Sequence, residues 1–109
     1  MAPLAPLRGQ VYDVPFRQGG RKPAVIVSNN RRNEKLPDVL VARLTTAPKP
    51  TVHSIVELDG RDQPLVGRVL CDDLDRVPKS LLTNLPRGAL TAGTMRRVDE
   101  GLKVALALR

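Results

Sequence analysis

The feature that most constrains this chain is a short apolar run, residues 25–27, which follows a pair of glycines and two adjacent cations. Three β-branched residues bounded by turn formers predict a largely buried strand, because the run is too short to cross a membrane. Pro23 fits the start of this strand, where no amide donor is needed. The glycines free the backbone beside Arg21 and Lys22, so a ligand can approach it. A solvated hairpin tip, charged for solubility, is the alternative.

The length of 109 residues fits one domain, because a domain of this size buries about two-thirds of its unfolded surface around one core. We therefore expect a single domain over residues 1–109, with residues 1–7 as a loose, proline-rich tail. The first residues are too few and too proline-rich for a signal peptide, and no apolar run approaches the roughly 18 residues of a membrane span. We expect a cytoplasmic protein with no membrane partner.

The charge is strongly positive and unevenly distributed. The net charge is +7 and the sequence pI is about 10.5, which points to an anionic partner such as nucleic acid or an acidic protein tail. Residues 1–50 carry nine basic against three acidic residues, whereas residues 51–109 carry nine against eight, which favours one basic face. Tyr12 and Phe16 are the two aromatic residues, too few for base stacking, so charge, amides and hydrogen bonds would have to hold a nucleic acid.

Cys71 is the single cysteine of the chain and His53 the single histidine. One chain can therefore build neither a disulfide framework nor a tetrahedral zinc site from these residues. We expect chemistry that needs no metal and no cofactor. His53 lies in an alternating segment, which favours a surface or interface position over a role as general base. We expect Cys71 to be buried and inert.

Short apolar runs bounded by turn formers predict a mainly β fold. The expected strands cover residues 10–16, 23–29, 38–46, 52–58, 65–72 and 85–90. Residues 29–35 lack an apolar period and predict a polar loop, and residues 78–82 predict a short helical turn. Arg43 interrupts the third strand, so we expect its side chain to project from a concave face, because an unpaired buried charge is costly. Gly67 predicts a bulge or bend.

One amphipathic helix is expected over residues 92–106, with Thr91 as its N-cap. Its apolar face consists of Met95, Val98, Leu102, Ala105 and Leu106. Short strands followed by one terminal helix are typical of a small β-barrel with helical decoration.

Five segments match, in order, the motifs of one protein family. Residues 8–12 look like its opening Arg-Gly-acidic-apolar-aromatic strand, and residues 22–29 like its Arg-Pro-hydrophobic-Ser-Asn block. The strand 39–46 ends in a threonine as the family's does, the pair 71–72 is a matching Cys-Asp, and residues 95–102 resemble the terminal helix. Over nearly its whole length, the chain thus resembles the MazF/PemK family of toxin ribonucleases from bacterial toxin-antitoxin modules.

The resemblance implies a small SH3-like barrel of the CcdB/PemK type and a homodimer. It implies metal-independent cleavage of single-stranded RNA at short sequences, with 2',3'-cyclic phosphate and 5'-hydroxyl products and inhibition of translation and growth. It also implies a cognate antitoxin whose acidic tail blocks the groove.

By position, the resemblance implies three catalytic residues, Lys22, Thr45 and Asp72. Lys22 stands where the family has an arginine before proline, and lysine keeps the charge but lacks the planar fork that grips a phosphate. Arg21 is the alternative source of that fork, and only one of the two can serve if neighbouring strand residues point to opposite faces. Leu70 replaces a family arginine, and the turn over residues 16–23 is shorter than usual.

RNA cleavage through its own 2'-hydroxyl needs a base, stabilisation of the phosphorane charge and an acid for the leaving 5'-oxygen. We assign phosphorane stabilisation or proton donation to Lys22, and hydrogen bonds to the scissile phosphate to Thr45 with Thr46. Asp72 acts as the base or orients a cation. The expected RNA-binding residues are Arg17, Gly20, Arg21, Arg43 and Thr46. In the alternative reading, Thr45 and Thr46 merely end a strand, and Asp72 belongs to a solvated acidic turn over residues 72–75.

Two other functions compete with RNA cleavage. A gyrase poison of the CcdB type shares the barrel, but such proteins use a C-terminal Trp-Gly-Ile segment, and this chain has no tryptophan. A non-catalytic SH3-like module that binds RNA or an acidic peptide is the other, and the lysine at position 22 keeps it open.

Overall fold

A computed structural model describes residues 5–17, 20–82 and 85–109 of the chain. It contains one antiparallel sheet of six strands in the order β4-β5-β3-β2-β1-β6. The strands are β1 (Gln10–Pro15), β2 (Arg21–Ile26), β3 (Asp38–Thr45), β4 (Ile55–Glu57), β5 (Arg68–Pro78) and β6 (Gly88–Ala89). The helices are α1 (Asn30–Lys35) and α2 (Ala92–Ala105), and the 3₁₀ turns are η1 (Gly60–Asp62) and η2 (Lys79–Leu81).

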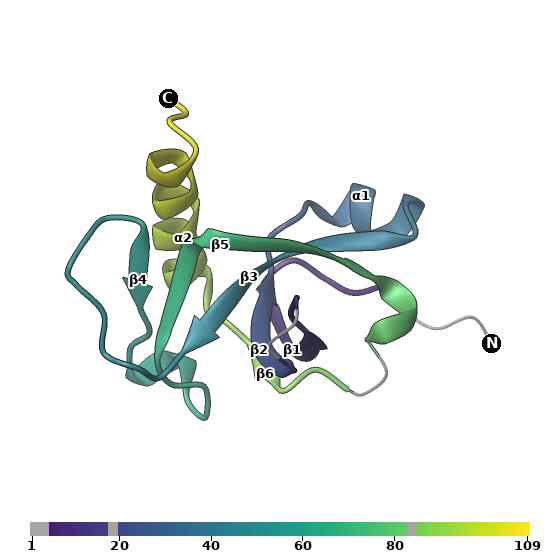
Figure 1. The fold of residues 1–109 in the computed structure, drawn as a ribbon, viewed down its shortest axis with the longest axis horizontal. Helices are drawn as coiled ribbons and strands as arrows, with labels where there is room; N and C mark the ends of the chain where they lie inside the picture. Colours follow the sequence, from purple (N-terminus) through teal and green to yellow (C-terminus); the bar gives the residue numbers. More distant parts are fainter. Residues whose placement is uncertain (1–4, 18–19, 83–84) are drawn as a thin grey trace.

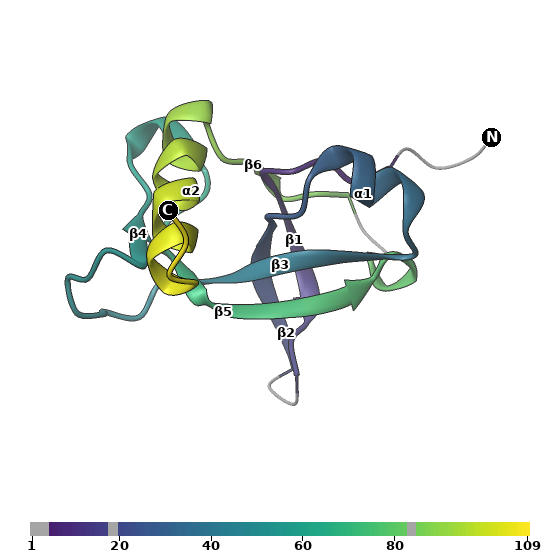
Figure 2. The same cartoon turned by 90° about the horizontal axis from the view of Figure 1, so that it is seen from above.

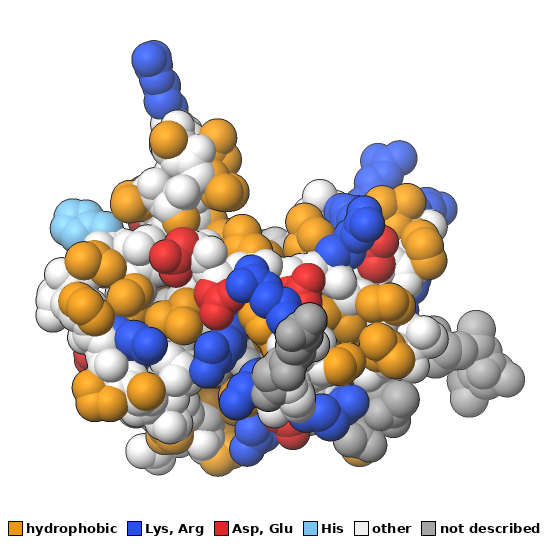
Figure 3. Space-filling view, in the orientation of Figure 1, with side chains coloured by type: hydrophobic (Ala, Val, Ile, Leu, Met, Phe, Trp, Pro, Cys, Tyr) orange, Lys and Arg blue, Asp and Glu red, His pale blue; other side chains and the backbone are white. Residues whose placement is uncertain are grey.

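The sheet curls into a half-barrel, in which β1 and β2 run across the direction of β3 and β5 (Figures 1 and 2). α2 stands beside β4 and β5 at one end of the molecule, and α1 lies at the other end (Figure 1). Lys and Arg side chains gather across the middle and lower part of the face drawn in Figure 3, with a few acidic ones among them. The mainly β, barrel-like fold predicted from the sequence is confirmed.

Alternation along the strands divides the apolar residues between two clusters. Val25 and Ala42 pack with Val98 of α2 on one face of the sheet. Ala24 and Val41, their neighbours in sequence, pack in a separate cluster on the other face. The face that carries Ala24 is therefore turned away from α2.

Several predicted elements are confirmed. β1, β3, the short strand β6 and the 3₁₀ turn η2 lie where the sequence places them. α2 begins at Ala92, and its predicted N-cap, Thr91, accepts a hydrogen bond from the Thr94 amide at 3.2 Å. β2 and β4 form with different bounds, since β2 begins at Arg21 and β4 has three residues.

Residues 30–35 form a helix, so the predicted polar loop over 29–35 is wrong. Asn29 caps this helix, because its side-chain oxygen accepts from the Arg32 amide at 2.8 Å. At the other end, the Lys79 ammonium donates to the Asn33 carbonyl oxygen at 2.9 Å. These capping contacts stabilise a short helix that has no apolar period.

β5 is longer than the strand predicted over residues 65–72, and it contains the acidic stretch 72–75 that the alternative reading placed in a turn. Ala42 pairs with Leu74, whereas the next residue, Arg43, pairs with Leu70. Residues 71–73 therefore form a bulge opposite β3. Gly67, where the bulge or bend was expected, has a φ of +112° and forms a bend before β5.

α2 packs closely on the sheet at Gly101. A Cβ atom there would lie 2.7 Å from Cys71 Sγ and 3.2 Å from Val56 Cγ2, so the helix approaches β5 as closely as it does because residue 101 has no side chain. Leu106, predicted on the apolar face, is exposed at the end of the helix. No helix in residues 5–17, 20–82 and 85–109 is long and apolar enough to cross a membrane.

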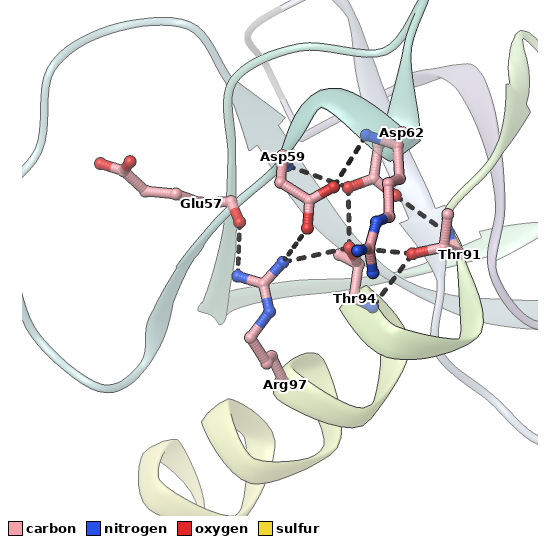
Figure 4. A network of polar contacts seen from close by, with 7 residues as sticks. Glu57, Asp59, Asp62, Thr91, Thr94 and Arg97 are labelled. Carbon is pink, nitrogen blue, oxygen red and sulfur yellow. Dashed lines mark hydrogen bonds and ion pairs between the residues drawn. The ribbon is translucent and has the colours of Figure 1, made fainter.

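The buried Asp62 carboxylate docks η1 on the N-terminus of α2 (Figure 4). It accepts hydrogen bonds from the Thr91 amide at 2.9 Å, the Thr94 hydroxyl at 2.7 Å and the Asp59 amide at 3.1 Å. Arg97 closes the network by donating to the Thr94 hydroxyl oxygen at 3.1 Å. A carboxylate near helix amides is well placed, because the helix dipole favours negative charge there.

The close packing at Gly101 makes a mutational prediction. Gly101→Ala is expected to lower the free energy of unfolding by about 1–3 kcal/mol, because the added methyl group overpacks the contact with Cys71. Gly93→Ala on the same helix is the matched control: the nearest atom to a Cβ there, Arg96 Nη2, lies at 3.7 Å, and alanine favours helix over glycine by up to about 1 kcal/mol. Urea denaturation measures both, and an undiminished stability of Gly101→Ala would contradict this packing.

The Asp62 network predicts a pH dependence. Burial raises the pKa of Asp62, but the hydrogen bonds from Thr91, Thr94 and Asp59 outweigh it, so the pKa is lowered. A carboxyl with a depressed folded-state pKa stabilises the fold above its unfolded pKa of about 3.9 and loses that contribution as the pH falls through the folded value. Asp62→Asn is expected to lower stability at pH 7 by about 1–3 kcal/mol and to flatten its decline below about pH 5. Urea denaturation from pH 7 to pH 3 tests this, and parallel pH curves for the two proteins would refute it.

Candidate functional site

Lys22 and Thr45 lie on one face of the sheet. The last residue pair between β2 and β3 is Ala24 with Arg43. Lys22 lies two residues before Ala24, and Thr45 two residues after Arg43. Because side chains alternate along a strand and paired residues share a face, all four belong to the face turned away from α2. Val14, the β1 partner of Lys22, packs in the same cluster as Ala24, in agreement with this assignment.

Arg21 belongs to the opposite face. Its guanidinium donates to the Asp13 backbone oxygen at 2.6 Å, and the Asp13 carboxylate pairs with Arg87 at 3.2 Å. Of the two adjacent cations, the structure thus brings Lys22 to the face of Thr45 and leaves Arg21 on the other.

The backbone around Thr45 is fixed by close contacts. Thr45 is 9% exposed, and its hydroxyl oxygen accepts from the Ala47 amide at 3.1 Å. A Cβ atom at Gly67 would lie 2.4 Å from the Thr45 carbonyl oxygen, so only glycine allows this approach. Thr46 is exposed, and its carbonyl oxygen accepts from Arg68 at 3.4 Å. The two threonines therefore present one nearly buried and one open side chain at the end of β3.

A pocket of about 370 Å³ lies between Arg17, after β1, and β5, and both charged and apolar side chains line it. It is lined by Arg17, Lys49, Ile55, Leu70, Asp72 and Asp73. Two of the predicted site residues, Arg17 and Asp72, therefore meet here. Leu70 is the β5 partner of Arg43, which places the pocket on the face of Lys22 and Thr45.

Asp73 joins two of the predicted RNA-binding arginines. Its carboxylate lies 3.3 Å from Arg17 Nη2 and 3.7 Å from Arg43 Nη1. Arg17 also donates to the Leu74 carbonyl oxygen at 3.0 Å, and its guanidinium lies 5.5 Å from the centre of the Phe16 ring. The side chain of Arg43 is about one-third exposed, and its Nε is buried without a hydrogen-bond partner among the described residues.

Sequence reasoning missed Asp73 and Lys49 as site residues. The stretch 72–75 offers several acidic residues, and without the bulge in β5 nothing distinguishes Asp73 from its neighbours. Lys49 stands between two prolines, which indicate only the end of a strand. Its position in the pocket depends on the path of the loop between β3 and β4, for which the sequence carries no signal.

Gly20 closes the turn between β1 and β2. Its φ is +76°, and its carbonyl oxygen accepts from the Phe16 amide at 3.0 Å. Apart from its chain neighbours, no atom of the described residues lies within 4 Å of the position a Cβ would take, so this part of the backbone is open to a ligand. Residues 18 and 19, which include the first glycine of the predicted turn, lie outside the described residues.

Cys71 and His53 lie outside this chemistry. Burial, and then the charge of Asp72, raise the pKa of the Cys71 thiol to about 11, so it stays protonated and unreactive at neutral pH. Its expected burial is confirmed. His53 is exposed, as expected, and lies beside α2 next to Arg96 and Arg97. In the described part of the chain, no group of three His, Cys, Asp or Glu side chains is placed to hold a metal ion.

The chain is similar to known toxins over nearly its full length. Residues 7–106 match the family described as PemK-like, MazF-like toxin of type II toxin-antitoxin system. The chain is 40% identical over 104 residues to endoribonuclease MazF1 of Mycobacterium bovis, which covers 95% of each protein.

Solved structures of endoribonucleases are also similar to this chain over nearly its full length. An endoribonuclease from a mycobacterial species superposes with a TM-score of 0.87 at 38% identity, covering 99% of this chain and 97% of that one. A second mycobacterial endoribonuclease, solved in complex with its cognate antitoxin, gives a TM-score of 0.88 at 40% identity over 96% and 98% of the two chains. By the match over residues 7–106 and by these identities, the chain belongs to the PemK/MazF family of toxins of type II toxin-antitoxin systems.

Proposed function

We propose that this protein is a toxin endoribonuclease that cleaves single-stranded RNA at short sequences, inhibits translation and growth, and is neutralised by a cognate antitoxin. Family membership and 40% identity to a protein named as an endoribonuclease support the activity. The observation that carries the proposal is the shared face of Lys22 and Thr45, with Arg43 on the same face.

The reaction uses the RNA's own nucleophile. The ribose 2'-oxygen attacks phosphorus, the bond to the 5'-oxygen breaks, and the products carry a 2',3'-cyclic phosphate and a 5'-hydroxyl. The Lys22 ammonium stabilises the phosphorane charge or protonates the leaving oxygen. Since the Thr45 oxygen already accepts from the Ala47 amide, its hydroxyl proton is free to donate to a phosphate oxygen. Asp72, exposed at the pocket, takes the 2'-hydroxyl proton or orients a cation.

The cations of this face replace a metal ion. Arg17 and Lys49 line the pocket beside Asp72, and Arg43 lies next to them through Asp73. A buried donor without a partner costs about 1–3 kcal/mol. Arg43 Nε has no partner among the described residues, and a phosphate oxygen that reached it would recover this energy. Guanidinium and ammonium groups supply the positive charge that a metal ion supplies in other nucleases, so the proposed reaction is metal-independent.

The proposed partners follow from the same charges. A carboxylate pairs with arginine as a phosphate does, so an antitoxin with an acidic tail would compete with RNA for this face. A mycobacterial relative with 40% identity was solved together with its cognate antitoxin, which supports this partner. A homodimer is proposed from family membership.

Lys22→Ala is expected to slow RNA cleavage by about a hundred- to a thousandfold, roughly 3–4 kcal/mol of barrier, because the phosphorane loses its positive partner. Lys22→Arg should retain activity, since arginine keeps the charge and adds a phosphate-binding fork. Arg21→Ala is the matched control on the opposite face, with an expected change of less than about threefold. Single-turnover cleavage of a labelled RNA measures all three, and a parent-like rate in Lys22→Ala would exclude the assigned role.

A second experiment tests the reaction class. Cleavage is expected to continue in excess chelator, to yield cyclic phosphate ends and to stop when the cleaved nucleotide lacks its 2'-hydroxyl. Cleavage of that 2'-deoxy substrate would overturn the mechanism. Trapping of gyrase on DNA without RNA cleavage would establish the gyrase poison instead, and RNA binding without cleavage would establish a binding module.

A further inference from the structure

The contact between Asp73 and two arginines joins parts of the chain that are distant in the sheet. Arg17 belongs to the turn that links β1 and β2, whereas Asp73 belongs to β5. In the sheet, β3 lies between β2 and β5. Arg17 therefore connects the end of β1 to β5, a strand that is not its neighbour in the sheet.

The contact depends on two local features of the backbone. Arg17 has a φ of +54°, a conformation that a residue with a side chain rarely adopts. Asp73 lies in the bulge of residues 71–73, where β5 leaves its register with β3. A bulge re-aims side chains, and here it directs a carboxylate toward the end of the β1–β2 turn.

The ion pair itself contributes little to stability. The Arg17 side chain is 61% exposed, and pairs at such exposure are typically worth less than about 1 kcal/mol. The Asp73 side chain is better covered, at 22% exposed, and lies close to both guanidinium groups. Without an anion, these two groups would repel each other. The geometry of the two arginines, more than the stability of the fold, depends on this carboxylate.

We propose that Asp73 is a positioning residue for RNA cleavage. It holds the Arg17 and Arg43 guanidinium groups beside the pocket and keeps Arg17, at the start of the link to β2 and Lys22, against β5. This inference rests on the proposed function. The affinity for an RNA backbone rises with the number of protein cations that contact its phosphates. Asp73 is an anion, so its loss should not weaken RNA binding. Since catalysis requires correct placement of charge, its loss should slow the chemical step.

The test compares Asp73→Asn with Asp75→Asn. Asp75 lies two residues along the same strand, accepts from the Arg76 amide at 2.8 Å and forms no ion pair among the described residues, so it controls for the change in net charge. We expect kcat of Asp73→Asn to fall by about tenfold or more, with an unchanged or lower Kd for a 2'-deoxy RNA that cannot be cut. Asp75→Asn should leave kcat within about twofold. Equal kcat values in the two variants, or weaker RNA binding by Asp73→Asn, would overturn the proposal.

A combined variant separates positioning from a general loss of stability. If Asp73 acts through the two arginines, adding Asp73→Asn to a variant that carries both Arg17→Gln and Arg43→Gln should lower kcat by less than about threefold further, because both contacts are already lost. Multiplied effects would refute the proposal.

Amide exchange gives a readout that does not need activity. The Phe16 amide donates to the Gly20 carbonyl oxygen across the turn, so its hydrogen exchange should be faster in Asp73→Asn than in Asp75→Asn. If the unmodified protein cuts no RNA, the proposed function fails, and this comparison still decides whether Asp73 holds the turn. Equal exchange rates in the two variants would show that it does not.

Discussion

The register between β2 and β3 decides which side chains of this protein can act together. Ala24 lies opposite Arg43, and alternation from that pair places Lys22 and Thr45 on one face and Arg21 on the other. A shift of one residue in this register would exchange the two faces. The buried residues on both sides exclude such a shift, because Val25 and Ala42 pack with α2 while Ala24 and Val41 pack on the opposite side. The hydrophobic core thus fixes the arrangement of the candidate site.

Charge on this face is balanced locally. The chain has a net charge of +7, but many of its arginines form ion pairs with acidic residues. Beside the pocket, Asp73 pairs with both Arg17 and Arg43. An anion that enters this pocket therefore meets cations already held in place, and it competes with a carboxylate for them. This arrangement suits a phosphodiester, which brings an anionic group of similar size and hydrogen-bonding capacity.

Much of the fold was predictable from local patterns, and the site only in part. β1, β3 and α2 follow from apolar periodicity and from the cap at Thr91, which depend on neighbouring residues alone. α1 was missed because its stability comes from the Asn29 cap and the distant Lys79. Lys22, Thr45 and Asp72 came from resemblance to a family, since nothing in their spacing indicates catalysis. The choice between Lys22 and Arg21 could not be made without the register between β2 and β3. The role proposed for Asp73 could not be inferred without the bulge in β5. Both features depend on contacts between strands that the sequence does not reveal.

The most direct test of this account is an NMR titration of the protein with a single-stranded RNA that carries a 2'-deoxy nucleotide at the cleavage site. If RNA binds at the face turned away from α2, the largest amide shifts are expected in residues 20–22, 43–46 and 70–73. Shifts centred on α2, around Arg97, would place the RNA on the other side of the molecule and contradict this prediction.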